Sequence, residues 1–178
     1  RAPLMSSPCY CPFCDGVCDI YGDHALVCSG GGDRTKRHNL LRNKAASYAS
    51  RAGMSPEVEK SGLLAPRPVI GARAENGSDP DSRGPSARRP ADVLARRPAD
   101  VYIPRLRTIG PVALDFAVTS GLRTSMLAQS IADPSAATNS YAATKRSHLD
   151  TAKQFEDEGI TFIPMVAEGA GGGWGDDA

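Results

Sequence analysis

Three cysteines and one histidine near the start of the chain have the spacing of metal ligands. Two residues separate Cys11 from Cys14, and three separate His24 from Cys28. Thiolates and imidazoles at such spacings can reach one tetrahedrally coordinated ion without strain, and zinc is the ion that prefers them. The pattern therefore predicts a closed zinc site, which supplies folding energy and keeps no open position for catalysis.

Two further cysteines, Cys9 and Cys18, leave the choice of ligands open, because Cys14 and Cys18 are also suitably spaced. The alternative is a disulfide framework in a secreted protein. The odd number of cysteines and the lack of an apolar signal-peptide core argue against it. The chain also lacks an initiating Met, and we expect it to be the cut end of a longer polypeptide.

A second group of candidate residues begins with a pair of aspartates. Residues 110–119 alternate in the manner of a β-strand. The neighbours of Asp115 on its face of this strand are Ala113 and Ala117, and such small residues leave room for a ligand. Asp100 begins the preceding strand, and antiparallel neighbours can bring the two carboxylates together. Such carboxylates bind Mg²⁺ together with substrate phosphates. The two predicted faces are Val112, Leu114, Phe116 and Val118, and Ala113, Asp115, Ala117 and Thr119.

The segment "ARRPADVLARRPADVY", residues 87–102, repeats one octet almost unchanged and so offers two equivalent aspartates. Asp92 is followed by a proline and two arginines, whereas the residues after Asp100 continue as a strand. We interpret the segment as a tandem duplication, in which Asp100 belongs to the site and Asp92 is the spare copy.

Glu59 and Lys145 complete the predicted catalytic set. Glu59 shares a face with Glu57 on a short strand, so that one of them could join an acidic cluster. Lys145 lies on the apolar stripe of a helix and faces the sheet, whereas Lys153 faces water. An inward lysine is costly unless it is paired, so it is either functional or salt-bridged. The stripe consists of Tyr141, Lys145, Leu149 and Ala152.

The elements that must position these residues follow from periodicity and breakers. A helix opens at residue 33 with Leu41, Ala45, Tyr48 and Ala52 on one face and ends at Gly53. Strands are expected within 54–64, 99–104, 110–119 and 160–166, with a second helix over 136–158. The order helix-strand-strand-strand-helix-strand predicts an α/β domain, residues 33–168, with a small mixed central sheet. A zinc module, 1–32, precedes it; a mobile insertion, 65–97, and a disordered Gly-rich tail, 169–178, complete the chain.

Charge and hydropathy exclude two classes of protein. The net charge of +1 excludes a globally basic nucleic-acid binder, although residues 83–107 carry seven arginines against two aspartates. This local stripe could attract phosphates or simply be a solvated loop. No apolar run reaches the length of about 18 residues that a membrane span needs.

Taken together, these motifs resemble a known family. They are similar to the restriction-like endonuclease domain, of the PD-(D/E)XK nuclease superfamily, at the C-terminal end of some non-LTR retrotransposon reverse transcriptases. The likeness covers nearly the whole chain apart from 65–97. It is carried by "CPFC", "DIYGDHALVC", "DRTKRHNLLRNKA", "VEKSGLL", "RRPADVYI", "ALDFAVT", "TKRSHL" and "GITFIPMVAEGAG".

The resemblance implies roles for single residues. Asp100 would be the aspartate of the family's Pro-Asp element, here separated from Pro98 by one alanine. Asp115 would be the second metal-binding carboxylate, and Glu59 the acidic residue that precedes it in the family's order. Ala117 stands where the superfamily usually has its lysine, and Lys145 on the following helix would replace that lysine, as in related retrotransposon domains.

His38 would be the family's histidine at the first helix, although a capping or packing role is an alternative. The resemblance further implies an endonuclease that depends on Mg²⁺ or Mn²⁺ and nicks target DNA. The nick would prime reverse transcription by a polymerase region on the same polypeptide, and we expect this to occur in the nucleus. The alternative is an inactive retroelement relic that keeps a zinc-dependent nucleic-acid-binding fold. The expected DNA-contacting residues are Arg37, His38, Arg42, Lys44, Arg96, Arg97, Arg105 and Arg107.

Overall fold

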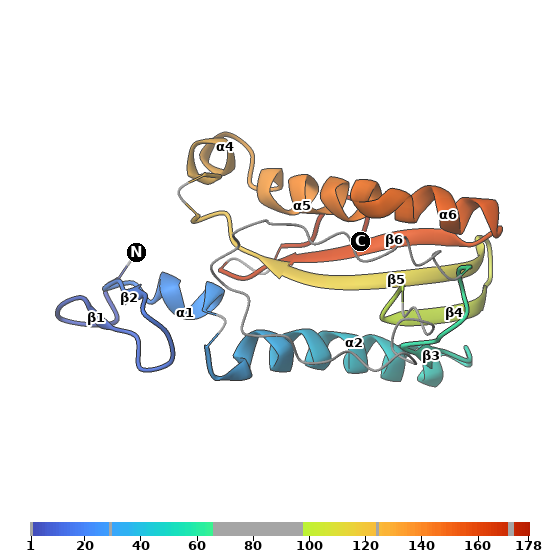
Figure 1. Cartoon of the computed structure of the whole chain (residues 1–178), viewed down its shortest axis with the longest axis horizontal. Helices are drawn as coiled ribbons and strands as arrows, with labels where there is room; N and C mark the ends of the chain where they lie inside the picture. The colour runs from blue at the N-terminus through green and yellow to red at the C-terminus, as the bar shows by residue number, and fades with distance from the viewer. Residues whose placement is uncertain (1, 29, 66–97, 124, 171–172) are drawn as a thin grey trace, which may run out of the picture.

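The computed structural model describes residues 2–28, 30–65, 98–123, 125–170 and 173–178. It confirms a mixed α/β protein with a four-stranded mixed sheet and a Cys/His cluster near the N-terminus. One long helix covers one face of the sheet, and two helices in succession cover the other (Figure 1). Most of the predicted insertion, with Asp92, Arg96 and Arg97, falls outside the described residues.

The N-terminal part is a hairpin followed by short helical turns. Strands β1 (Cys9–Tyr10) and β2 (Val17–Cys18) pair antiparallel, with Cys9 opposite Cys18. Helix α1 (Asp23–Val27) and the 3-10 turn η1 (Gly30–Gly32) then lead into the long helix. This part protrudes at one end of the molecule, beside the start of that helix (Figure 1).

Helix α2 (Asp33–Arg51) covers one face of the sheet. Its buried residues Ala46 and Ala49 pack with Val101, Ile103 and Phe116 of the sheet. The helix ends as predicted before Gly53, whose φ of 77° is a left-handed conformation that suits glycine. The expected core position of Tyr48 is wrong, since 62% of this side chain is exposed. The small alanines let the helix lie close to the sheet, and this places Tyr48 on the outer flank.

The sheet has the order β3-β4-β5-β6. Its strands are β3 (Glu57–Val58), β4 (Val101–Leu106), β5 (Gly110–Thr119) and β6 (Thr161–Glu168). The first three strands pair antiparallel, and β6 runs parallel to β5. The predicted two faces of β5 are confirmed: Phe116 packs on the α2 side, whereas Ala113 and Ala117 belong to the clusters beneath the other helices.

The second helix is not continuous. The chain forms α4 (Leu127–Ala132), which the sequence did not predict, then α5 (Ala136–Ser147), the turn η2 (His148–Asp150) and α6 (Thr151–Asp157). Leu149 and Asp150 have φ values of 55° and 53°, which break the helix. The break leaves Leu149 51% exposed, so its predicted place on the apolar stripe is wrong. It also turns α6 so that the ring of Phe155 stacks on Phe162 with 5.3 Å between centroids.

The described residues of the predicted Gly-rich tail, 169–170 and 173–178, make defined contacts with the rest of the domain. The backbone N–H of Gly175 donates to the carbonyl of Val166 at 2.9 Å. Asn139 of α5 donates to Asp176 at 2.7 Å and accepts from its backbone N–H at 3.1 Å, and Arg146 pairs with Asp177. Polar partners on α5 therefore hold the C-terminus, which composition alone could not reveal.

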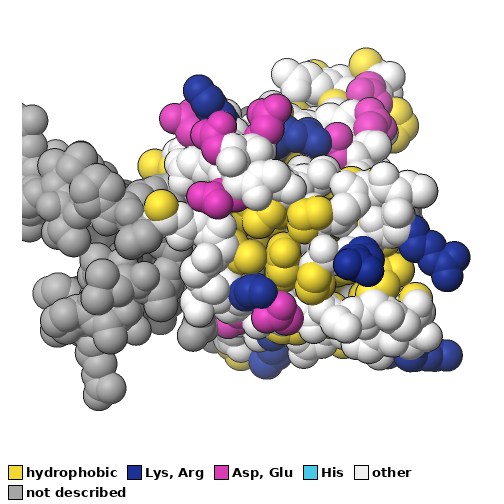
Figure 2. All heavy atoms as spheres, turned by 90° about the vertical axis from the view of Figure 1, so that its right-hand side faces the viewer, with side chains coloured by type: hydrophobic (Ala, Val, Ile, Leu, Met, Phe, Trp, Pro, Cys, Tyr) yellow, Lys and Arg dark blue, Asp and Glu magenta, His cyan; other side chains and the backbone are white. Residues whose placement is uncertain are grey.

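The two ends of the molecule differ in surface character. The end that carries the turn between β4 and β5 shows hydrophobic side chains gathered at its centre, with charged side chains around them (Figure 2). Ile109 in that turn is 49% exposed. The opposite end combines the last residues of β5 with the start of α2 (Figure 1). Among the described helices, none is long and apolar enough to cross a membrane.

Candidate active site and metal centre

The four predicted zinc ligands come together in the N-terminal part. Their ligand atoms all lie within 4.8 Å of one another. The Sγ atom of Cys28 is 3.7 Å from those of Cys11 and Cys14, and Cys14 Sγ is 3.2 Å from His24 Nε2. In a tetrahedral site with Zn–S bonds of about 2.3 Å, neighbouring sulfurs are about 3.8 Å apart. The cluster could therefore hold a zinc ion with little movement of its ligands.

Backbone N–H groups point at the sulfurs and favour their charged form. The N–H groups of Phe13, Gly16 and Gly30 donate to Cys11, Cys14 and Cys28 at 3.4, 3.4 and 3.3 Å. The bond from Phe13 is the main cause that lowers the pKa of Cys11 to about 6, with smaller contributions from His24 and the other thiols. A cysteine that is already a thiolate near neutral pH is prepared to bind a cation.

Cys18 differs from these ligands. Partial burial, together with the neighbouring Cys11 and Cys9, raises its pKa to about 11, so that it stays a neutral thiol. It lies on β2 opposite Cys9, and neither residue belongs to the metal-ligand group among the described residues. The structure thus selects Cys11, Cys14, His24 and Cys28 from the five cysteines and the one histidine of the motif.

Asp100 lies where the chain enters β4. Its backbone N–H donates to the carbonyl of Leu114 at 2.9 Å, which holds it against β5. Its Oδ2 atom accepts two hydrogen bonds, one from the backbone N–H of Phe116 at 2.6 Å and one from His38 Nε2 at 2.9 Å. The carboxylate is fixed from two sides, with only 14% of its side chain exposed.

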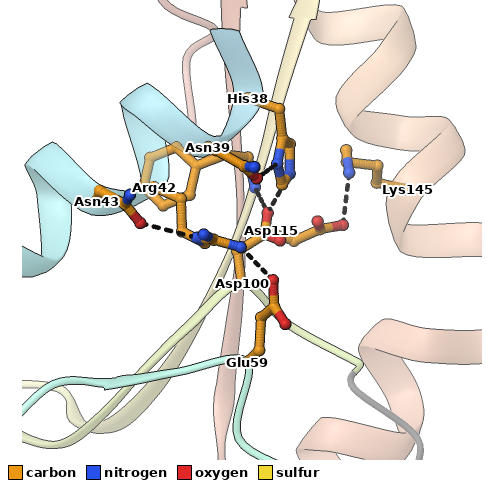
Figure 3. Close-up of polar contacts among 9 residues, drawn as sticks. His38, Asn39, Arg42, Asn43, Glu59, Asp100, Asp115 and Lys145 are labelled. Carbon is orange, nitrogen blue, oxygen red and sulfur yellow. Dashed lines mark hydrogen bonds and ion pairs between the residues drawn. The ribbon is translucent and has the colours of Figure 1, made fainter. Parts of the chain in front are cut away.

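Asp115 faces the opposite helix layer and pairs with Lys145 of α5. The Nζ and Oδ2 atoms are 2.6 Å apart, with 17% of the lysine and 24% of the aspartate side chain exposed. Burial raises the pKa of Asp115; Lys145 opposes this rise, and the nearby Asp100 carboxylate adds to it. His38 and Lys145 approach the two aspartates from helices on opposite sides of the sheet (Figure 3). Two carboxylates that repel each other at one place on a sheet can together bind a divalent cation.

Glu59 lies near this pair but has another partner. Strand β3 ends at Val58, and Glu59 follows it with a left-handed φ of 49°. Its backbone N–H donates to the carbonyl of Asp100 at 2.9 Å, while its carboxylate accepts from Arg42 of α2 (Figure 3). The predicted face shared with Glu57 does not form, because the strand is too short; Glu57 instead pairs with Lys60 at 2.7 Å.

A cleft of about 350 Å³ lies beside the aspartates, at the carboxyl end of β5. Among the predicted DNA contacts, Arg37 and His38 line it, whereas Arg42 is occupied by Glu59. Lys44 is exposed on α2. Arg105, five residues beyond Asp100, lies about 16 Å along the strand. Arg105 and Arg107 are exposed near the far end of β4, and the structure does not bring them to the cleft.

Arg123, Thr119 and Ser120 also line the cleft, and the sequence did not indicate them. They are only weakly indicated by the sequence: Arg123 lies in the loop "SGLR" that follows a predicted strand, and loops after strands often carry binding residues. Only the sheet shows that this loop and Arg37 of α2 border one space.

The chain matches no protein-family model, no curated protein and no solved structure.

Proposed function

We propose that this chain is a metal-dependent DNA endonuclease domain of a retrotransposon-derived protein, with a PD-(D/E)XK type of site. The observation that supports this best is the convergence of Asp100 and Asp115 from neighbouring strands, with Lys145 and His38 on either side of them. In this proposal the domain nicks target DNA, and a reverse transcriptase region of the same polypeptide extends the new 3′ end in the nucleus.

Asp100 and Asp115 would hold the catalytic cation. Carboxylate oxygens are the ligands that Mg²⁺ and Mn²⁺ prefer, and one or two of them suffice when substrate phosphates complete the coordination. A divalent cation would also relieve the repulsion through which Asp100 raises the pKa of Asp115. Such an ion, when bound, polarises the scissile phosphate and makes a bound water more acidic.

The other residues have positioning and charge-stabilising roles in this proposal. Lys145 already lies at hydrogen-bonding distance from Asp115, so its ammonium group is placed to orient water or to stabilise negative charge that develops on the phosphate. His38 holds the Asp100 carboxylate through Nε2. Lys145 would take the part of the superfamily lysine, whose usual position here holds Ala117.

The zinc module supports a role with nucleic acid because it borders the same cleft. Leu26 of α1 is one of the lining residues. A zinc ion bound by Cys11, Cys14, His24 and Cys28 would be structural, since four protein ligands fill a tetrahedral site. It would stabilise helix α1, which carries Leu26 to the cleft.

One observation favours a second candidate, an inactive relic that binds nucleic acid without cleaving it. Glu59, the predicted third acidic residue, is paired with Arg42. A site that needs all three carboxylates would then be incomplete.

Nicking of supercoiled plasmid DNA by the zinc-loaded chain with Mg²⁺ or Mn²⁺ tests the proposal. Asp100→Asn and Asp115→Asn should each abolish nicking, because an amide is a poor ligand for a hard cation. Asp92→Asn is the matched control, since Asp92 has the same preceding residues as Asp100, and it should nick like the wild type. A wild-type chain that binds zinc and DNA but leaves the plasmid intact would favour the relic.

A further inference from the structure

The cleft beside the aspartates is lined by four basic side chains and by no carboxylate among the described residues. Two of these side chains have acidic partners, since Lys145 pairs with Asp115 and His38 with Asp100. Arg37 and Arg123 make no ion pair with any residue that the structure describes. The cleft therefore has a net positive charge that comes from two guanidinium groups.

Arg37 extends from α2 into this space with one polar atom already shielded from water. Its Nε atom is buried and has no hydrogen-bond partner in the described part of the chain. A buried N–H without an acceptor is costly, and the cost is larger for a charged group. An anion in the cleft would supply the missing acceptor and offset this cost.

Arg123 is held in place by the loop that follows β5. Its Nε donates to the carbonyl of Ser120 at 3.2 Å, and its Nη2 donates to Thr119 Oγ1 at 3.1 Å. These two bonds fix the plane of the guanidinium group while its charge stays unneutralised. A cation that is oriented before the ligand arrives loses little conformational entropy on binding.

We propose that Arg37 and Arg123 form a phosphate-binding subsite, which holds a backbone phosphate of the DNA strand next to the one that is cut. This inference rests on the proposed function, because Lys145 lies at the border between the cleft and the aspartates. Guanidinium groups match phosphate oxygens in a two-pronged geometry, and a phosphodiester carries one negative charge for the two arginines to share. The subsite would fix the register of the strand without reading its sequence.

Binding of a fluorescently labelled DNA duplex to the full zinc-loaded chain, measured by anisotropy over a range of KCl without Mg²⁺, tests the subsite. Arg37→Gln and Arg123→Gln should each weaken binding about tenfold at low salt, as the loss of one charge-assisted hydrogen bond predicts. Each should also reduce the slope of log K against log [salt], and the two substitutions together should reduce it by about 0.9, the value for the one phosphate that the arginines share. Arg51→Gln is the matched control, because Arg51 is exposed on the same helix about 21 Å from Arg37.

The outcome for Arg37→Gln is decisive even if Arg123→Gln loosens its loop, since Arg37 makes no side-chain hydrogen bond within the described residues. Wild-type affinity and salt slope in Arg37→Gln, with zinc retained, would overturn the subsite. So would calorimetric binding of inorganic phosphate that needs both arginines while DNA binding does not, because the ligand would then be a free phosphate. Loss of DNA binding in both variants of a chain that never nicks would contradict only the proposed activity.

Discussion

Replacement of Lys145 by methionine tests most directly whether this lysine stabilises the charged form of Asp115 beside Asp100. The bond between Nζ and Asp115 Oδ2 is 2.6 Å long, and both side chains are mostly shielded from water. A hydrogen bond between charged groups contributes about 1.5–3 kcal/mol net. For a chain of this size 1 kcal/mol shifts the melting temperature by about 2–4 °C, so that Lys145→Met should melt roughly 3–12 °C lower.

The loss should also depend on pH, with a sign that follows from Asp115. Burial already raises the pKa of this carboxyl group, and without Lys145 the repulsion from Asp100 is no longer opposed, so the pKa should rise further. A carboxyl group whose pKa is higher in the folded protein destabilises it as pH rises above the ordinary value of about 3.9. The variant should therefore lose more stability at pH 8 than at pH 5.

Thermal unfolding followed by circular dichroism at both pH values measures this effect. Lys153→Met is the matched control, since Lys153 is exposed on α6 and the described residues offer it no acidic partner. Adding Asp115→Asn to Lys145→Met should restore part of the lost stability, because the unpaired carboxylate is then gone. Equal melting temperatures for the two lysine variants, or a larger loss at pH 5, would refute the account of the site.

Two further predictions concern the zinc module. Cys14→Ser should lose the bound zinc, whereas Cys18→Ser should keep about one equivalent, because, of these two cysteines, only Cys14 belongs to the group of four candidate ligands. Elemental analysis of the purified chains measures the zinc content. Loss of zinc in both variants would mean that Cys18 is a ligand. Gly30→Ala should release zinc to a chelator more readily, since its Cβ would lie 2.4 Å from the Phe13 carbonyl oxygen beside Cys14. Gly173→Ala, whose Cβ would meet nothing within 4 Å, is the control, and equal zinc retention in the two would contradict the packing argument.

Much of the candidate metal centre and of the central strand was predictable because both depend on residues close in sequence. The four Cys and His residues that could hold zinc lie within 18 consecutive positions, and loop spacing limits which of them can meet. The alternation of β5 is equally local, and so is the inward direction of Lys145, which is set by helical periodicity. The helix break at Leu149 was not predictable in this way. It goes together with the packing of Phe155 on Phe162, a contact between α6 and β6 that helical periodicity does not describe.

By itself, the sequence determined the two chemical groups, a set of soft ligands and a set of carboxylates with a lysine. The tertiary structure decided their partners. In the folded chain Glu59 pairs with Arg42, Asp100 with His38, and Asp115 with Lys145. Arg37 and Arg123 line one cleft. These pairings join residues from 17 to 62 positions apart. Periodicity has no information at that range, because such contacts depend on how the helices pack against the sheet.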